Sequence, residues 1–207
     1  MQYWIFYWGG VGGDGFANLL EHANNLKPAD GELKWRSVLM PNGKVRFNQP
    51  NWVDNHALFR HHYEGFDPNS VKLNPVYLDI VNKGENTVIP SHPWQYCDSL
   101  DSLTFKDVVT KDQHKIFLYS TNKERIIADF NDKVLPDEVT RIKAEEAVRT
   151  TDMLDPNNYP PLNFYDTLID IDRAWVDWEY LNEILVRIGI DLPKSAYDSY
   201  LLVSKRP

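Results

Sequence analysis

Apolar and polar residues follow one another along this chain in blocks that predict short buried strands separated by helices. The first block, residues 3–8, is wholly apolar or aromatic, and a glycine-rich run and the helical spacing of residues 16–26 follow it. Continuous apolar runs of this kind are typical of strands buried on both faces of a parallel sheet. Similar runs predict strands over 86–90, 115–119 and 167–171. Strands that alternate with helices predict an α/β domain with a mostly parallel sheet covered on both faces.

A different pattern interrupts this alternation after the first helix. Residues 33–40 alternate like a strand, Pro41-Asn42-Gly43-Lys44 is a strong turn signal, and residues 45–47 form the predicted return strand. Two short strands around such a turn are typical of a hairpin. The sequence therefore predicts a β-hairpin, near residues 33–47, inserted between the units of the sheet.

Helical spacing recurs further along the chain. It predicts short helices over 57–63, 76–82 and 124–130, a charged helix over 137–150, and a last helix from Trp178 to Ile188. Gly189 is the predicted stop of the last helix, because glycine readily adopts the left-handed conformation that ends a helix.

Length and charge narrow the class of protein. The 207 residues predict a single domain, 1–207, large enough to bury a substantial core. The whole net charge of −8 lies in residues 76–207, which hold 15 basic and 23 acidic residues. Proteins that bind nucleic acid present a basic face to phosphate, so no nucleic-acid partner is expected.

Cysteine content and hydropathy bear on the compartment. Cys97 is the single cysteine, which excludes an internal disulfide and favours a reducing, cytoplasmic location. The apolar start is interpreted as a first strand and not as a signal peptide, because it has no basic lead-in and passes directly into glycines. No stretch approaches the roughly 20 apolar residues needed to cross a bilayer, so no membrane span is expected.

Half of the ten glycines lie within seven residues near the start of the chain. A glycine loop between a strand and a helix lets the backbone approach an anion such as phosphate and aims the unpaired N–H groups of the helix at it. The alternative is a tight turn in which glycine only relieves steric strain. On the first interpretation the candidate binding residues are Gly10, Gly12, Gly13, Asp14, Gly15 and Phe16.

Two common nucleotide motifs fit this loop poorly. A Walker A loop needs a Lys and a Ser or Thr after its last glycine, whereas Phe16 and Ala17 follow here. The spacing Gly10-x-Gly12-x-x-Gly15 matches the dinucleotide fingerprint of an NAD(P)-dependent oxidoreductase. That fingerprint needs an acidic residue at the end of the second strand, and Asp30 and Glu32 precede the predicted strand instead.

Four loops are expected to meet at one edge of the sheet. They are residues 9–15, 91–94, 120–125 and 172–177, and each follows a predicted parallel strand. Ligands of open α/β sheets bind at the carboxyl ends of the strands.

Taken in order, these segments resemble the P-loop-like sulfotransferase family, which transfers a sulfuryl group from 3′-phosphoadenosine 5′-phosphosulfate (PAPS) to an acceptor. The resemblance covers most of the chain, although each motif is loose. The segments that carry it are Phe6–Phe16, Val88–Pro93, Ile116–Phe130, Leu168–Asp172 and Leu181–Leu192.

The resemblance implies a three-layer P-loop NTPase-like fold and a hydroxylated acceptor, such as a carbohydrate. It also implies that residues 9–16 and the turn 120–125 bind PAPS, with Ser120, Asn122 and Arg125 as the candidates in that turn. His92, at the end of a predicted strand, would be the base that deprotonates the acceptor hydroxyl, since its pKa lies near neutrality. The alternative for His92 is a hydrogen-bonded histidine in a loop held by Pro90 and Pro93.

The chain also departs from the family pattern. Asp14 and Phe16 stand where the family has Lys and Ser or Thr. Aligned on Asn122, the family's Arg falls at Thr121, its Asp at Arg125 and its Ser at Asp129. A carboxylate repels a phosphate by about 4 kcal/mol for unit charges about 4 Å apart at an effective dielectric constant near 20. The C-terminal basic donor loop has no match. The rival hypothesis is therefore a relative that binds a nucleotide or glycan without turnover.

Other polar clusters favour structural explanations. His56, His61 and His62 lack the spacing of a metal site, so no metal is predicted. Trp175 and Trp178 are expected in the core, whereas Trp52 and Trp94 are candidates for stacking on a sugar or base. Strand alternation and helix capping account for the remaining acidic cluster, which consists of Asp166, Asp170, Asp172 and Asp177.

Overall fold

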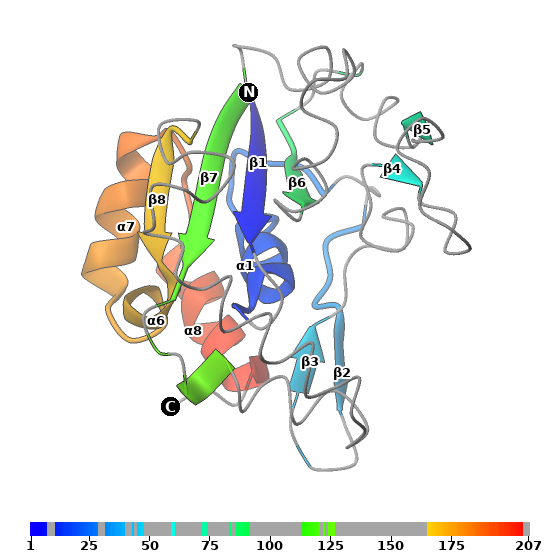
Figure 1. Cartoon of the computed structure of the whole chain (residues 1–207). Helices are drawn as coiled ribbons and strands as arrows, with labels where there is room; N and C mark the ends of the chain where they lie inside the picture. The colour runs from blue at the N-terminus through cyan, green and yellow to red at the C-terminus, as the bar shows by residue number, and fades with distance from the viewer. Residues whose placement is uncertain are drawn as a thin grey trace.

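The structure is a computed structural model, and it describes the first strand and helix, most of the sheet and the C-terminal helices. The residues described are 1–7, 11–28, 32–39, 43, 45–47, 59–60, 72–73, 83, 86–91, 113–120, 122, 124–126 and 165–204. Their elements, in chain order, are β1 (Gln2–Tyr7), α1 (Gly13–Leu20), β2 (Ser37–Leu39), β3 (Val45–Phe47), β4 (Phe59–Arg60), β5 (Lys72–Leu73), β6 (Val88–Ser91), β7 (Gln113–Tyr119), β8 (Thr167–Asp170), α6 (Ile171–Ala174), α7 (Trp178–Arg187) and α8 (Lys194–Ser204) (Figure 1).

The main sheet has four parallel strands in the order β6-β1-β7-β8. Tyr3 lies opposite Val88 on one side and His114 on the other, and Ile116 lies opposite Thr167. After β1 the chain adds β6 on one side, then passes to the other side to add β7 and β8. The gap between β1 and β7 is thus a topological switch point. The predicted α/β fold with a mostly parallel sheet is confirmed.

β1 is one of the two inner strands of the sheet and is buried along its whole length. Successive side chains of a strand point to opposite faces. Tyr3, Ile5 and Tyr7 belong to the core cluster that includes the helices. Trp4 and Phe6 lie on the other face, where the ring of Phe6 lies 5.4 Å from that of Tyr165. This burial on both faces explains why the sequence of β1 has no polar alternation.

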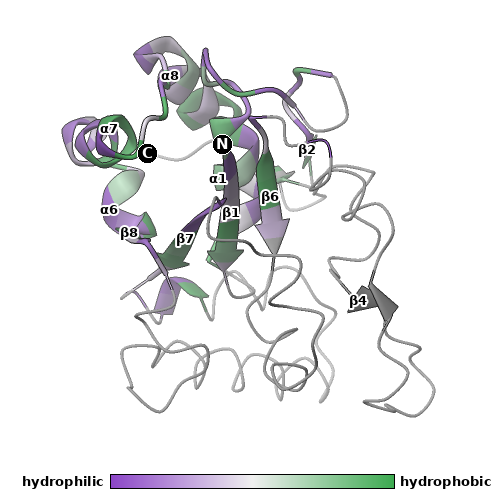
Figure 2. Cartoon of the chain, turned by 90° about the horizontal axis from the view of Figure 1, so that it is seen from above, coloured by the Kyte–Doolittle hydropathy of each residue, from purple (hydrophilic) through white to green (hydrophobic). Residues whose placement is uncertain are grey.

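The described helices cover one face of the sheet only. Figure 2 shows α1, α7 and α8 on the same side of the strands. Leu19 and Leu20 of α1 and Leu181 and Leu185 of α7 are fully buried against the sheet. The sequence predicted cover on both faces, and the described helices supply it on one.

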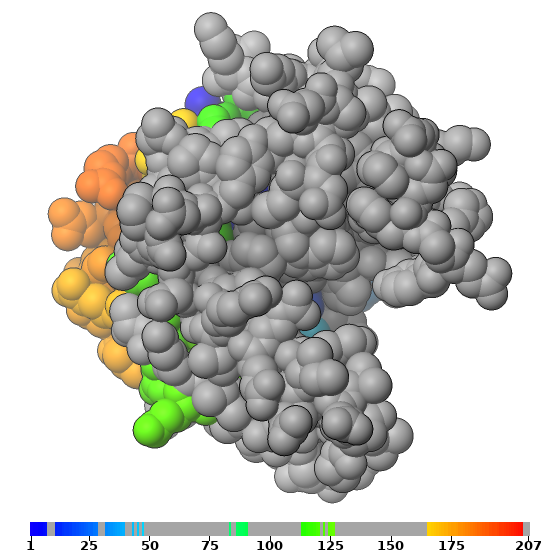
Figure 3. Space-filling view, in the orientation of Figure 1, coloured from blue at the N-terminus to red at the C-terminus, as the bar shows by residue number. Residues whose placement is uncertain are grey.

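The predicted C-terminal helix is confirmed as α7, and its ends follow from local chemistry. Asp177 is the N-cap, and its carboxylate accepts a hydrogen bond from the Tyr180 amide. Gly189, at φ 80°, ends the helix in the left-handed conformation that glycine adopts most easily. Residues of α6 and α7 lie at the surface, at the left margin of the molecule in Figure 3. The outer side of α7 is therefore open to solvent, and Val186 on it is 65 % exposed.

The sequence analysis missed α8, which begins directly after Pro193. Its apolar and polar residues are not clearly separated onto two faces, so the local helical pattern is weak. Tyr200 nevertheless stacks on Trp175 at 4.5 Å and on Phe47 at 4.9 Å, and the Tyr197 hydroxyl donates to the Ala174 carbonyl at 3.1 Å. Contacts with residues distant in the sequence therefore stabilise this helix.

Two antiparallel pairs lie outside the main sheet. β2 and β3 pair Ser37 with Phe47, and Gly43 between them has φ 79°, so the predicted hairpin is confirmed with a shorter first strand. The helix predicted over 57–63 is wrong at Phe59–Arg60, which form β4 and pair with β5. Seven residues are too few for helical spacing to exclude a strand.

A buried polar cluster attaches residues 32–36 to α1. The Arg36 guanidinium forms an ion pair with the Glu21 carboxylate, and these side chains are 6 % and 3 % exposed. Asn18 lies beside them, donating to Glu21 at 3.1 Å and accepting from the Arg36 amide at 2.9 Å. Residues 34–36, just before β2, are thus held against α1 by hydrogen bonds and a buried ion pair.

Within the residues described, no helix is both long enough and apolar enough to span a bilayer.

Candidate functional site

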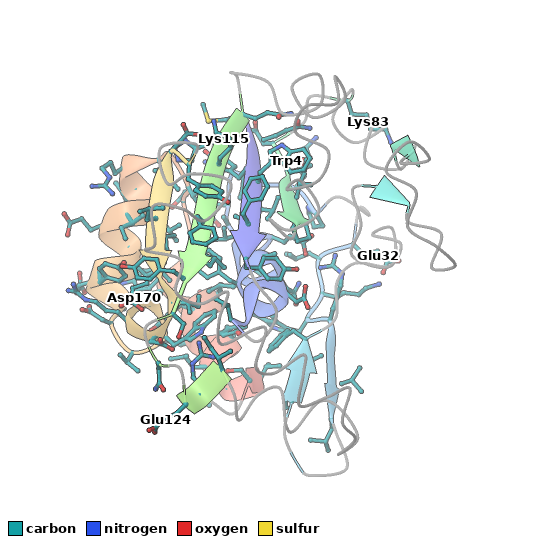
Figure 4. The ribbon with its side chains drawn as sticks, viewed as in Figure 1. Trp4, Glu32, Lys83, Lys115, Glu124 and Asp170 are labelled. Atoms are coloured by element: carbon teal, nitrogen blue, oxygen red, sulfur yellow. The ribbon has the colours of Figure 1, made fainter. Side chains whose placement is uncertain are left out.

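The candidate site lies at the carboxyl edge of the sheet. β1, β7 and β8 all end there, and they lead into α1, the turn 120–126 and α6. Figure 4 shows Asp170 and Glu124 at this end, and Lys115 near the opposite end of β7. The glycine loop and the turn 120–125, as far as they are described, therefore reach the same edge, as predicted. Gly10 and His92 lie outside the described residues.

Backbone geometry and packing account for the described glycines of the loop. Gly12 is the N-cap of α1 with φ 90° and ψ 23°, in the left-handed region where glycine avoids the penalty of a side chain. A Cβ on Gly13 would lie 1.9 Å from Cγ of Tyr7, and one on Gly15 would lie 2.4 Å from the hydroxyl of Tyr200. These contacts favour the tight turn among the two interpretations of the loop.

The side chains at the start of α1 are also committed to the fold. The Tyr7 hydroxyl donates to the Asp14 carboxylate in the first turn of α1. A carboxylate in this position interacts favourably with the positive end of the helix dipole, and it adds a negative charge where an anion would bind. Phe16 is fully buried, with its ring 5.8 Å from that of Trp175, so its side chain packs in the core and does not line the edge.

The turn after β7 brings its three candidate residues together around one carboxylate. Ser120 Oγ donates to Asp172 Oδ2, and the backbone N–H of Asn122 donates to the same oxygen at 3.3 Å. Arg125 Nε donates to Asp172 Oδ1 at 2.6 Å. Asn122 Oδ1 accepts from the Arg125 amide at 3.0 Å, which closes the turn. Ser120, Asn122 and Arg125 therefore form a single cluster with Asp172, which belongs to α6.

Asp172 is the residue of this cluster that the sequence analysis did not select. It was placed among four aspartates assigned to strand alternation and capping. Its neighbour Asp170 is indeed the N-cap of α6 and accepts from the amides of Asp172 and Arg173. One feature of the sequence could have indicated Asp172 as a site residue, namely its position just after the last predicted strand. The sequence did not show which residue it would contact.

At this edge the positive charge of Arg125 is paired with the carboxylate of Asp172. The Arg125 and Asp172 side chains form an ion pair, and each is 23 % exposed. Arg125 was expected to provide a cation for the donor phosphate, and in the structure its charge faces a carboxylate. The pair remains partly open to solvent.

The other aspartates have structural roles. The Tyr180 amide N–H, followed by the Arg173 guanidinium, holds the pKa of the Asp177 carboxyl below its usual value. At the opposite edge, burial raises the pKa of Asp166, but hydrogen bonds from Lys115 outweigh this effect and hold it below the usual value. In the part of the chain that the structure describes, no three His, Cys, Asp or Glu side chains are grouped as metal ligands.

The described residues also bear on the dinucleotide fingerprint. The strand that follows α1 in the sheet is β6, which ends at Ser91 and not at an acidic residue. Glu32 lies outside the sheet, 67 % exposed, in an ion pair with Lys34. The ribose-binding carboxylate of that fingerprint therefore has no counterpart at Glu32. His56, His61, His62, Trp52 and Trp94 lie outside the described residues.

Comparison with known proteins gives a structural likeness and no family. No family model and no curated protein matches the chain. One of the solved structures that it is similar to is an uncharacterized protein from Eubacterium ventriosum ATCC 27560. The likeness has a TM-score of 0.39 at 14 % sequence identity, and it covers 88 % of this chain and 98 % of that chain.

Proposed function

We propose that this protein binds a phosphorylated nucleotide at the carboxyl edge of its sheet, between β1 and β7. The observation that carries the proposal is the cluster of Ser120, Asn122 and Arg125 in the turn after β7, one of the two strands that border the topological switch point. Ligands of open α/β sheets bind at this point, and hydroxyl, amide and guanidinium groups are the donors that phosphate oxygens accept from.

The donor class follows from the resemblance to the P-loop-like sulfotransferases. On that basis the nucleotide is PAPS, the fold is the P-loop type, and the reaction is sulfuryl transfer to a hydroxylated acceptor. His92 is the proposed base. The turn 120–125 would hold the 3′-phosphate of the donor, and the backbone of residues 9–15 would face its phosphosulfate.

A second candidate is a relative of the same fold that binds a nucleotide or glycan without turnover. The observation that favours it is the negative charge at the site. Asp14 lies in the first turn of α1, and Asp172 neutralises Arg125. Both carboxylates oppose the accumulation of charge on a phosphosulfate group.

Titration by calorimetry tests the binding proposal. We expect micromolar affinity for 3′,5′-adenosine diphosphate, the product that PAPS leaves, and weaker binding of ATP and NAD. Arg125→Gln should weaken the binding of the 3′-phosphorylated nucleotide about tenfold to a hundredfold, because hydrogen bonds to charged groups contribute about 1.5–3 kcal/mol. Arg125 is a better target than Gly12, where any side chain would meet a positive φ.

Arg187→Gln is the matched control for this titration. Arg187 is exposed in the last turn of α7. The Tyr3 hydroxyl, at the amino end of β1, donates to the carbonyl of neighbouring Ile188, so this turn lies at the opposite edge of the sheet. Arg187→Gln makes the same change of charge and should leave the affinity unchanged. Equal affinities of wild type and Arg125→Gln would refute the site.

Transfer of radiolabelled sulfate from PAPS to a panel of hydroxylated carbohydrates then separates the two candidates. We expect label in an acceptor, with 3′,5′-adenosine diphosphate released in equal amount. Nucleotide binding without transfer to any acceptor on the panel would favour the non-catalytic relative.

A further inference from the structure

Asp172 is the centre of the polar cluster at the carboxyl edge. Its carboxylate accepts hydrogen bonds from the Ser120 hydroxyl, the backbone N–H of Asn122 and Arg125 Nε. The first two donors share Oδ2, and the guanidinium uses Oδ1. A single side chain from α6 therefore fixes the turn after β7, 47 residues earlier in the chain.

The position of Asp172 is itself fixed. Its amide donates to Asp170 Oδ1 at 3.0 Å, within the N-cap of α6. Ile171 and Ala174, on either side, are fully buried. The carboxylate is thus held beside Arg125 by the backbone of α6, and it does not depend on the rotamer of a long flexible side chain.

The three donors around Asp172 are the groups that would contact a phosphate or sulfate. A carboxylate and a phosphate both accept charge-assisted hydrogen bonds from such donors. The side chains of Arg125 and Asp172 are each 23 % exposed, so part of the ion pair faces solvent. Because Asp172 carries the same sign of charge as the ligand, it competes with the ligand for Arg125 and repels it.

We propose that Asp172 is an internal counter-ion that sets the affinity of this edge for a phosphate or sulfate group, acting through Arg125. The inference rests on the proposed nucleotide site and names the residue that regulates its affinity. In the free protein the carboxylate holds the turn in its binding conformation. When a ligand binds, its anionic group takes over part of the interaction with Arg125.

Asp172→Asn tests this role, because it removes the charge and keeps an oxygen that accepts from Ser120 and Asn122. We expect it to bind 3′,5′-adenosine diphosphate about tenfold more tightly than wild type, by calorimetry at low ionic strength. Uncharged adenosine should bind equally to both proteins. Adding Arg125→Gln to Asp172→Asn should abolish the gain, since Asp172 acts through that guanidinium.

Asp177→Asn is the matched control for the change of net charge. Asp177 also forms an ion pair, with Arg173, and asparagine caps a helix as well as aspartate does. It should leave the affinity within about twofold of wild type. Asp172→Ser provides the same test with a second side chain in case the asparagine variant does not fold, as judged by circular dichroism.

The outcomes separate this inference from the proposed function. If wild type binds the nucleotide and the folded Asp172 variants bind it equally or more weakly, Asp172 does not act as a counter-ion and the nucleotide site stands. A gain in Asp172→Asn that persists in the double variant would also overturn the inference. If neither wild type nor any Asp172 variant binds, both proposals are wrong.

Discussion

Replacing Glu21 by Ala is expected to lower the free energy of unfolding by about 3–5 kcal/mol, because it leaves the buried Arg36 guanidinium without its carboxylate. The two side chains are 3 % and 6 % exposed, so solvent replaces little of the lost interaction. Asn18 loses an acceptor at the same time. Chemical denaturation of wild type and variant, monitored by circular dichroism, measures the difference.

Two controls make this prediction specific to burial. Glu32→Ala breaks the pair with Lys34, whose side chains are 67 % and 46 % exposed, and should cost less than about 1 kcal/mol. Replacing Glu21 and Arg36 together by Met should recover most of the stability, since an apolar pair of similar volume is often as stable as a buried ion pair. Equal losses for Glu21→Ala and Glu32→Ala would show that the cluster does not hold residues 32–36 on α1.

Gly13→Ala is expected to destabilise the protein by about 1–3 kcal/mol or more, although alanine is the better helix former. The added Cβ would lie 1.9 Å from Cγ and 2.2 Å from both Cδ atoms of Tyr7. Tyr7 is 2 % exposed and is held by its hydrogen bond to Asp14, so its ring has little room to move. The midpoint of urea denaturation reports the change.

Gly43→Ala is the control that separates packing from backbone strain. A Cβ on Gly43 would meet no atom within 4 Å, and the cost there comes from φ 79° alone, about 1–2 kcal/mol. If Gly13→Ala is as stable as wild type or more stable, as helix propensity alone would make it, the close approach of β1 and α1 is wrong. A large cost would also confirm that packing, and not a ligand, requires glycine at this position.

The sequence predicted where the candidate site lies, but not how its residues interact. Its location at the carboxyl edge was predictable, because parallel strands end on the same side and Ser120, Asn122 and Arg125 follow one of them. The ion pair of Arg125 with Asp172 was not predictable. Asp172 belongs to α6, and nothing in the sequence of either segment indicates that the two would meet. The same reason explains why Asp172 was interpreted as a capping residue, when its neighbour Asp170 is the cap.

The sequence by itself determined the elements whose cause is local. The burial of β1 along its whole length and of the apolar residues of β6 and β7 follows from apolar runs in the sequence. The hairpin around Gly43 and the ends of α7 at Asp177 and Gly189 follow from turn residues and caps within a few positions. Each of these depends on the chemistry of neighbouring residues, which the sequence states directly.

Only the tertiary structure decided what depends on residues far apart in the chain. The strand order places β1 between β6 and β7, although Tyr3 pairs with Val88 and Gln2 with Gln113, 111 residues away. α8 is stabilised by aromatic contacts of Tyr200, and the buried Arg36 and the edge residue Arg125 each meet a carboxylate from another segment. The packing of the whole chain determines these contacts. Each local segment could pair with many others, and only the folded arrangement brings the actual partners within reach.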